Sequence, residues 1–322
     1  MVTVIQSCRE PKVTVLTTTF NQAHFLPKCI ASVQKQTFQN FEHIILDDGS
    51  TDNTEQLMKT FKDPRIIYVK RPHVGMTKLK EVYNHGLSLA SGEFVTILEA
   101  DDYYPSDKMG KQIPSMSGSV LSFGKVVEVD ENGNFLSISP KAKQFKGVID
   151  WLTPLLIFDY ITALTVMMRK TALDTIGGFH QPKDGRCVDY YTFLKLAMIG
   201  KFAFIDEVMG YWVKHGKNLS NVVLDDNASL IAIKYSIAFC QEQGIPVPFK
   251  ALSGQRGKNL FHVGRHHLLN GDKKKALSCF KQSLVLSSTL SKTKSVYGMI
   301  LSIFNVNMEG LVKSLRRPME RT

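Results

Sequence analysis

The sequence predicts an α/β fold, with a mainly parallel sheet flanked by helices, followed by a small all-helical region. Apolar, strand-like runs alternate with segments of helical spacing up to about residue 104. Several of these runs end in polar residues, as strands do at the carboxyl edge of a parallel sheet. After about residue 227 the strand signals disappear and helical patterns replace them. These observations together favour a nucleotide-binding type of sheet with a helical appendage.

The first part of the chain has the pattern βαβαβαβ. Strands are expected over residues 12–19, 41–46, 65–70 and 94–98, which are rich in Val, Ile, Leu and Thr. Helices are expected over residues 26–37, 54–61 and 76–90, where apolar residues recur at helical spacing. Right-handed crossovers make such a sheet mainly parallel, with helices covering both faces.

The alternation weakens after Tyr104. Residues 119–130 and 135–139 predict a hairpin around the Asn132-Gly133 turn. Further along, helices are expected over 171–176 and 189–199, and a strand over 202–208. The hairpin would add antiparallel strands beyond the nucleotide half and could shape an acceptor site.

The C-terminal part is expected to be helical. Residues 254–270 and 273–286 predict an antiparallel helix pair whose Gly264, Ala276 and Phe280 are spaced much as in tetratricopeptide units. Residues 311–322 form a basic end of the chain. This tail either lies on an anionic membrane surface or packs as a terminal helix on the domain.

The composition is that of a packed globular protein with a basic surface. The 322 residues are 43% hydrophobic and 10% aromatic, and the net charge is +11. The positive charge favours an anionic partner, whether nucleotide phosphates, an acidic membrane face or nucleic acid. The five cysteines are scattered without a close pair, which fits neither a disulfide framework nor a zinc site.

The chain shows no cleavable signal and no membrane span. Residues 1–10 lack a long apolar region, and the most apolar run, residues 148–168, is broken by Asp150, Pro154 and Asp159. With the cysteine pattern, this predicts a cytoplasmic protein, and the basic tail leaves open a peripheral position at the inner face of the cell membrane.

Three carboxylates follow the uncharged strand of residues 94–98. Glu99, Asp101 and Asp102 come at its carboxyl end, which in open α/β sheets faces the ligand crevice. Oxygen ligands suit hard cations such as Mg²⁺, which in phosphate-binding enzymes often use only one or two carboxylates. Taken alone, the cluster is either a metal site or a solvated acidic turn that helps to cap the next helix.

Several motifs occur in one order, and this set resembles the family 2 glycosyltransferases of GT-A fold over roughly residues 11–222. The motifs are Thr17-Thr-Thr-Phe20-Asn21, Asp47-Asp-Gly-Ser-Thr-Asp52, Gly92-Glu-Phe94, Glu99-Ala-Asp-Asp102, Gly177-Gly-Phe179 and Asp189. The resemblance implies a Rossmann-like sheet, a nucleotide-diphosphate sugar donor, a divalent metal (Mn²⁺ or Mg²⁺) and inversion at the anomeric carbon. It divides the chain into an N-terminal extension (1–10), a nucleotide-binding half (11–104), an acceptor half (105–222) and a helical C-terminal region (223–322).

The resemblance also assigns roles to residues of the donor site. Thr18, Phe20 and Asn21 look like the loop that brackets the nucleoside, and Asp48 like the residue that binds the base. Asp101 resembles the metal-binding aspartate of the DxD motif, with Asp102 beside it. The first acid of that motif is Glu99 here, which keeps a carboxylate but changes its reach.

Transfer also needs a base and groups that stabilise the leaving diphosphate. Asp189 resembles the family's general base, although Val188 stands where an acid usually precedes it. Its alternative role is a helix N-cap. Lys214 and His215 resemble the basic stretch that closes over the pyrophosphate, and a purely structural role for His215 is the alternative.

These features predict an inverting transferase that moves a sugar, with a UDP-sugar as the first choice of donor, to a glycan or lipid-linked glycan. A degenerate, inactive relative that binds proteins through its helical region is the alternative, because Glu99 and Val188 depart from the family pattern. A sugar-nucleotide pyrophosphorylase would begin with a glycine-rich loop, and residues 11–21 contain no glycine. Nucleic-acid binding is not expected, because no basic and aromatic motif supports it.

Overall fold

The structure is a computed structural model that describes residues 12–139, 147–149, 151–157, 161–182, 188–216, 218, 228–269, 271–286, 295–296, 299 and 302. The expected N-terminal extension (1–10), the expected boundary at residue 222 and the basic tail (311–322) lie outside the described residues. The chain divides into two compact units. Unit 1 comprises Met1–Leu155 with Tyr160–Asn218, and unit 2 comprises Leu156–Asp159 with Leu219–Thr322.

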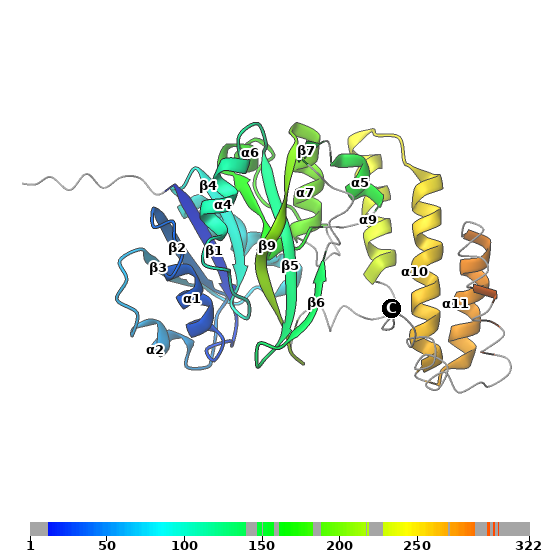
Figure 1. Ribbon diagram of the computed structural model, residues 1–322, viewed down its shortest axis with the longest axis horizontal. Coiled ribbons are helices and arrows are strands. Elements are labelled where there is room, and N and C mark those ends of the chain that lie inside the picture. The colour runs from blue at the N-terminus through cyan, green and yellow to red at the C-terminus, as the bar shows by residue number, and fades with distance from the viewer. Residues whose placement is uncertain are drawn as a thin grey trace, which may run out of the picture. The chain divides into compact units, whose positions relative to one another are not determined.

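Unit 1 contains, in its described part, one nine-stranded sheet of order β3-β2-β1-β4-β8-β5-β9-β7, with β6 paired to β5 (Figure 1). The strands are β1 (Val13–Thr19), β2 (Phe41–Asp47), β3 (Ile66–Lys70), β4 (Phe94–Glu99), β5 (Leu121–Asp130), β6 (Phe135–Ser139), β7 (Gly147–Ile149), β8 (Met167–Arg169) and β9 (Phe202–Lys214). The helices are α1 (Leu26–Gln34), α2 (Thr54–Met58), η1 (Met76–Lys78), α3 (Leu79–Leu89), α4 (Lys108–Ser115), α5 (Leu152–Ile157), η3 (Ala163–Thr165), α6 (Lys170–Thr175) and α7 (Val188–Ile199).

The parallel half of the sheet confirms the expected fold class. The strands β3, β2, β1 and β4 lie side by side in parallel, joined through α1, α2 and α3. Beyond β4, the strand β8 pairs antiparallel with both β4 and β5, and β9 runs parallel to β5. The sheet is therefore mixed, with its antiparallel strands on the side away from β3.

Helices cover both faces of the parallel half because its strands are apolar on both sides. Val13 and Val15 of β1 belong to one core cluster with side chains of α1 and α4. On the opposite face Leu16 packs against α3, where a Cβ on Gly86 would come within 3.0 Å of a Leu16 methyl. Because Gly86 has no side chain, the helix α3 can pack close to the sheet at this point.

The second half of unit 1 confirms the predicted hairpin and lengthens one predicted strand. The strands β5 and β6 pair antiparallel around Gly133, which has φ of 85°. The strand β9, expected over 202–208, continues to Lys214 because it pairs with β5 from Phe202 to Lys214. The two acids Asp206 and Glu207 and the glycine at position 210 interrupt the apolar pattern and hide the rest of the strand from sequence reasoning, whereas pairing with β5 continues it.

Unit 2 confirms the predicted helix pair. Its described helices are α9 (Ala228–Gln243), α10 (Phe249–Leu269) and α11 (Lys273–Leu286). Phe280 of α11 is fully buried against Gly264 of α10, and the Ser283 hydroxyl donates to the Gly257 carbonyl at 2.6 Å. Among the helices that the structure describes, none has the length and apolarity needed to cross a membrane.

Candidate active site

The carboxyl ends of β1, β2 and β4 meet at one edge of the sheet. Thr18 lies opposite Glu99 of β4 in the parallel register, and Thr19 lies opposite Asp47 of β2. The order β2-β1-β4 places the turn after β2 two strands from the turn after β4, which is roughly 10 Å. Thr18, Asp48 and the carboxylates after β4 thus share one edge, as the sequence predicts.

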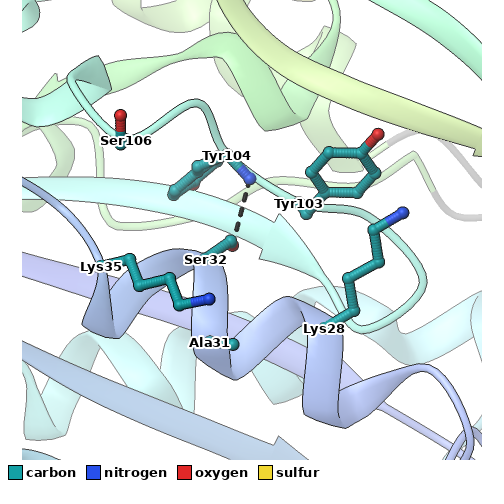
Figure 2. A pocket seen from close by; sticks show the side chains of 7 residues that line it. All are labelled: Lys28, Ala31, Ser32, Lys35, Tyr103, Tyr104 and Ser106. Atoms are coloured by element: carbon teal, nitrogen blue, oxygen red, sulfur yellow. Dashed lines mark hydrogen bonds between the residues drawn. The ribbon is translucent and has the colours of Figure 1, made fainter. Parts of the chain in front are cut away.

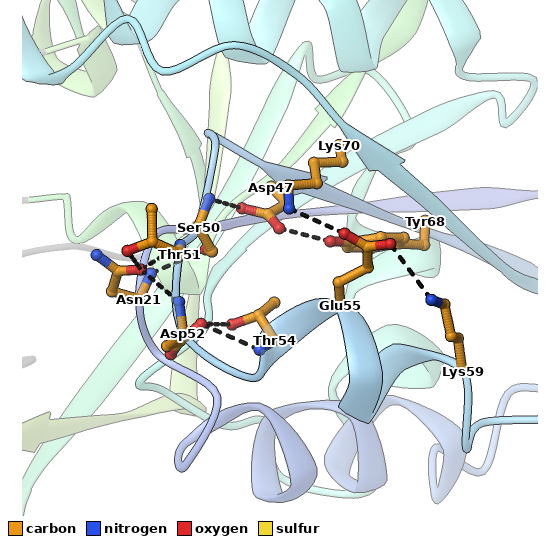
Figure 3. A network of polar contacts seen from close by, with 10 residues as sticks. All are labelled: Asn21, Asp47, Ser50, Thr51, Asp52, Thr54, Glu55, Lys59, Tyr68 and Lys70. Carbon is orange, nitrogen blue, oxygen red and sulfur yellow. Dashed lines mark hydrogen bonds and ion pairs between the residues drawn. The ribbon is translucent and has the colours of Figure 1, made fainter.

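The loops after β1 and β2 are tied together by Asn21 (Figure 3). Its side-chain oxygen accepts hydrogen bonds from the backbone N–H groups of Thr51 and Asp52 at 2.8 and 3.2 Å, and its own N–H donates to the Ser50 hydroxyl at 2.9 Å. Asn21 has a φ of 53°, a conformation that asparagine adopts more readily than most residues. Its local role is therefore to hold the two loops in register.

Asp47 anchors the start of the same loop. Its carboxylate accepts hydrogen bonds from the N–H of Ser50 at 2.8 Å and from the hydroxyl of Tyr68 on the neighbouring strand (Figure 3). Asp47 is fully buried. Burial, followed by the hydrogen bond to Asp47, raises the pKa of Tyr68. The first aspartate of the pair is therefore a structural residue, and the second, Asp48, is the one that reaches the adjacent loop.

Asp48 organises the loop that follows β3. Its two carboxylate oxygens accept the N–H groups of Val74 and Gly75, both at 3.0 Å, and one of them lies 2.9 Å from His73 Nδ1. The His73 ring stacks on Phe20 with centroids 4.1 Å apart, and Phe20 is 40% exposed. Phe20 and His73 thus present an aromatic surface beside Asp48.

Glu99 lies among other acidic groups at the end of β4. Its carboxylate accepts a hydrogen bond from the Tyr83 hydroxyl of α3 at 3.2 Å. Burial, and then the charges of Asp101 and Asp189, raise the pKa of Glu99 to about 7. Asp189, ninety residues further along the chain, is therefore brought within electrostatic reach of Glu99.

Asp189 is the second residue of α7 and is partly buried. Burial raises the pKa of its carboxyl group. The chain that leads to it is held by α3, because Asn84 accepts the Phe179 N–H at 2.7 Å and donates to the Phe179 carbonyl at 3.0 Å. Gly178 must be glycine there, since a Cβ would come within 2.3 Å of the Asn84 amide oxygen and φ is 87°.

Asp101 is held by groups at the end of β9. His215 Nε2 lies 2.9 Å from one carboxylate oxygen of Asp101, and the Asn218 amide donates to the same oxygen at 3.3 Å. Asn218 also accepts the His215 backbone N–H at 2.6 Å, and Phe25 stacks on the imidazole at 4.5 Å. The structure thus brings Asp101 and His215 together.

Asp102 has a different environment from its neighbour. Its carboxylate accepts the Val213 N–H of β9 at 2.9 Å and is almost fully buried. Burial, then the charges of Asp101 and Glu99, raise its pKa well above the usual value. Asp102 therefore joins β4 to β9, while Glu99 and Asp101 are the acids that stay partly accessible.

Lys214 lies at the end of β9 beside this cluster. Its ammonium group lies 3.5 Å from the centre of the Trp212 ring, a cation–π contact, and its charge partly offsets the rise in the pKa of Asp102 that burial causes. In the described part of the chain no three His, Cys, Asp or Glu side chains are arranged as a ready metal site. The carboxylates of Glu99 and Asp101 nevertheless provide hard oxygen ligands at one strand end. Mg²⁺ and Mn²⁺ are commonly bound by one or two such carboxylates together with phosphate oxygens.

Sequence reasoning missed three residues that hold this site. His73 pairs with Asp48 and Phe20, Tyr83 binds Glu99, and Asn218 joins His215 to Asp101. No local sequence pattern points to His73 or Tyr83, because their partners lie in distant parts of the chain. Asn218 could have been suspected from its place three residues after His215, a spacing suited to capping a turn.

Curated relatives support the expected family. The chain is 27% identical to the chondroitin synthase of Pasteurella multocida (strain Pm70) over 222 residues, which is 67% of this chain and 22% of that protein. It is 27% identical to the hyaluronan synthase of Pasteurella multocida over 217 residues, 66% of this chain and 21% of that protein. The chain thus spans about a fifth of the length of these two relatives.

Solved structures share the fold. The Staphylococcus aureus protein TarS, residues 1–349 in complex with UDP-GlcNAc, superposes with a TM-score of 0.64 at 14% identity, over 90% of both chains. The mannosyltransferase PcManGT of Pyrobaculum calidifontis, in complex with GDP-Man and Mn²⁺, gives a TM-score of 0.56 at 18% identity, over 92% of this chain and 81% of that one.

The family assignment rests on a direct match as well. Residues 14–176, about half of the chain, match the model of glycosyl transferase family 2. That segment contains both predicted nucleoside loops and the acidic strand end, in the order that the sequence resemblance requires. The chain belongs to glycosyl transferase family 2.

Proposed function

We propose that this protein transfers a sugar from a nucleoside-diphosphate donor to a hydroxyl group of a glycan or lipid-linked glycan, with inversion at the anomeric carbon. The observation that carries the proposal is the group of acids at the end of β4, where the charges of Asp101 and Asp189 both raise the pKa of Glu99, at an edge of the sheet that also carries Asp48. The two solved neighbours bind UDP-GlcNAc and GDP-Man, which supports a nucleotide sugar as the donor class here.

The nucleoside end of the donor is assigned to the loops after β1 and β2. Phe20 and His73 offer a stacked, partly exposed aromatic surface, and the Asp48 carboxylate lies against His73. We assign Thr18 and Asn21, at the end of β1 and in the loop after it, to the nucleoside as well. Stacking on an aromatic ring suits every nucleobase, so this surface supports nucleoside binding without selecting the base. We infer a UDP-sugar as the first donor to test.

The diphosphate end is assigned to Glu99, Asp101, Lys214 and His215. Glu99 and Asp101 would hold a divalent metal, which when bound neutralises charge on the leaving diphosphate. Lys214 adds a positive charge on the same side, since it acts on Asp102 through space. His215 holds Asp101 in place through the contact between its Nε2 and the Asp101 carboxylate.

Asp189 is assigned as the general base. It takes the proton of the acceptor hydroxyl as the new bond from oxygen to the anomeric carbon forms and the bond to the diphosphate oxygen breaks. Attack from the face opposite the diphosphate inverts the anomeric centre. Because burial raises the pKa of Asp189, its carboxylate is a better base at neutral pH than an exposed aspartate. Activity should therefore fall as the pH falls through that raised pKa.

A donor screen tests this proposal. Hydrolysis and transfer are measured from UDP-, GDP- and dTDP-sugars with Mn²⁺, in the wild type and in the Asp101→Ala and Asp189→Asn variants. We expect turnover to drop by roughly 10²–10⁴-fold in Asp189→Asn while metal-dependent nucleotide binding persists. Asp107→Asn, an exposed carboxylate paired with Lys111 on α4, is the matched control. Near-normal turnover in Asp189→Asn would disprove the base assignment, and nucleotide binding without turnover in the wild type would favour a binding module.

A further inference from the structure

A cavity of about 240 Å³ lies between α1 and the turn of residues 103–106 (Figure 2). We call it the α1 pocket, and its lining includes Lys28, Ala31, Lys35, Tyr103 and Tyr104. It is smaller than the ~300–1,000 Å³ of pockets for drug-sized ligands, so it suits a single sugar unit better than a whole donor. None of these residues takes part in the donor site assigned above.

The two lysines of the α1 pocket have no acidic partner among the described residues. Neither Lys28 nor Lys35 forms an ion pair with any residue in the part of the chain that the structure describes. Some other lysines of unit 1 are paired, as in Lys111 with Asp107 and Lys170 with Asp174, so it is the shared pocket that distinguishes Lys28 and Lys35. Partial burial lowers the pKa of Lys28, and no carboxylate offsets that effect. The pocket therefore carries uncompensated positive charge.

The lysines are also placed for one ligand. Both lie on or directly after α1, two helical turns apart, and Figure 2 shows both side chains at the pocket. The Lys28 ammonium group is held 3.8 Å from the centre of the Tyr103 ring. The rest of the lining consists of Ala31, the two tyrosines, whose rings are apolar, and Ser32 and Ser106. The lysines can bind an anionic group, and the tyrosine rings can pack against the sugar ring that carries it.

The walls of the α1 pocket are preformed. The Ser32 hydroxyl accepts the Tyr104 N–H at 3.1 Å (Figure 2). It also donates to the Cys29 carbonyl at 2.7 Å. The Thr37 N–H donates to the Ser106 carbonyl at 2.7 Å. These bonds join α1 to the 103–106 turn at two places, so little ordering is needed when a ligand binds.

The pocket shares a wall with the acidic cluster. Tyr103 follows Asp102 directly and exchanges backbone hydrogen bonds with Tyr211 of β9, at 2.9 and 3.3 Å. The two tyrosine rings stack with centroids 4.7 Å apart. A ligand in the α1 pocket would therefore touch the turn that carries the donor-site carboxylates.

We propose that the α1 pocket binds an anionic sugar unit of the acceptor, one that bears a phosphate or carboxylate group held between Lys28 and Lys35. The role of this sugar as part of the acceptor rests on the proposed function, whereas its binding to the pocket does not. The pocket would hold a unit near the one that receives the new sugar, and it would select charged acceptors over neutral ones of the same size.

The first test is binding of simple probes. Glucose 6-phosphate and glucuronic acid, with glucose as the neutral control, are titrated by ligand-observed NMR into the full chain with UDP and Mn²⁺ present. We expect the dissociation constants of both anionic probes to rise at least fivefold in the Lys28→Met/Lys35→Met double variant. The Lys62→Met/Lys201→Met variant, which removes the same charge elsewhere on unit 1, should bind as the wild type does. Equal affinity in the two double variants overturns the proposal.

The second test separates the sources of the anion and the two proposals. Cosedimentation with phosphatidylglycerol vesicles measures lipid binding. If the Lys28→Met/Lys35→Met variant loses vesicle binding but binds glucose 6-phosphate as the wild type does, the glycan assignment is overturned. In transfer assays, the pocket variant should raise the KM for an anionic acceptor at least fivefold and leave kcat within twofold. If the wild type binds the probes through these lysines yet transfers no sugar, the proposed function fails and the anionic sugar site stands.

Discussion

The carboxylate of Asp48 uses both of its oxygens to hold a neighbouring loop. The sequence resemblance predicts only that this residue meets the nucleobase, and that role remains a prediction. The structure adds that Asp48 accepts two backbone N–H groups from residues 74 and 75 and holds His73 beside Phe20. A residue assigned to the ligand is thus also one that shapes the ligand's surroundings.

Replacing Asp48 with asparagine should weaken nucleotide binding. The amide offers one acceptor in place of two, and its NH₂ group would face a backbone N–H, so the 73–75 loop loosens. Hydrogen bonds to a charged group contribute roughly 1.5–3 kcal/mol, and we expect the dissociation constant for UDP to rise about tenfold or more. Calorimetric titration of UDP with Mn²⁺ measures it. Asp174→Asn on α6, an exposed carboxylate, is the control, and an unchanged affinity in Asp48→Asn would contradict the assignment.

At the scale of elements, the strand β2 carries a polar residue where a parallel strand is normally apolar. His43 is fully buried, its Nε2 lies 2.8 Å from the Thr17 hydroxyl of β1, and its Nδ1 has no hydrogen-bond partner in the described part of the chain. Burial lowers the pKa of His43 to about 3. The pairing of β1 with β2 therefore depends on a neutral imidazole.

This histidine predicts a loss of stability in acid. Its folded pKa lies below the unfolded value of 6.5, so its contribution is present above pH 6.5 and is lost as the pH falls towards 3. At about pH 4.5 the loss relative to neutral pH is roughly 3 kcal/mol. Urea unfolding at both pH values measures it. His43→Gln cannot titrate and should lose less stability in acid, whereas the exposed His24→Gln should behave like the wild type.

The helix pair of unit 2 predicts opposite effects for two glycines of α10. A Cβ on Gly264 would come within 2.8–3.1 Å of the buried Phe280 ring, whereas a Cβ on Gly254 would meet nothing within 4 Å. Gly264→Ala should destabilise unit 2 by about 1–3 kcal/mol through overpacking, and Gly254→Ala should stabilise it by up to about 1 kcal/mol. Thermal unfolding followed by circular dichroism compares the two. Equal melting temperatures would show that this helix contact is not close packed.

At the scale of the whole molecule, the residues assigned to the donor site do not account for the net charge of +11. The α1 pocket uses two of the uncompensated lysines, and the tail of residues 311–322 carries Lys313, Arg316, Arg317 and Arg321. The structure does not describe the tail, and its role at a membrane remains a prediction. Both features would favour anionic partners.

Deleting residues 311–322 should reduce binding to anionic vesicles. Each basic residue near such a surface contributes about 1 kcal/mol, so loss of this cluster should lower the fraction sedimented with phosphatidylglycerol vesicles severalfold. Raising the salt concentration should have a similar effect, because it screens these charges. Vesicles of phosphatidylcholine are the control. Equal sedimentation of the full and shortened chains with anionic vesicles would exclude the tail as the attachment point.

Local pattern determined much of the fold. The strands β1, β2, β3 and β4, the hairpin of β5 and β6, and the pair α10 and α11 were predictable, because each shows its own periodicity or turn residues over several residues. The three-residue strand β8 was not, since so short a run has no period to detect, and the helix α4 was concealed by Pro114 and the buried Lys108.

By itself, the sequence determined the parallel half of the sheet and the order of motifs that end its strands, because hydrophobic alternation and polar strand ends are properties of neighbouring residues. Only the tertiary structure decided which side chains meet. It brought Tyr83 to Glu99, Asn218 to Asp101, and Asp189 within electrostatic reach of Glu99 across a gap of ninety residues. Those contacts depend on the packing of α3, α7 and β9 around β4, a long-range arrangement for which a single sequence carries no local signal.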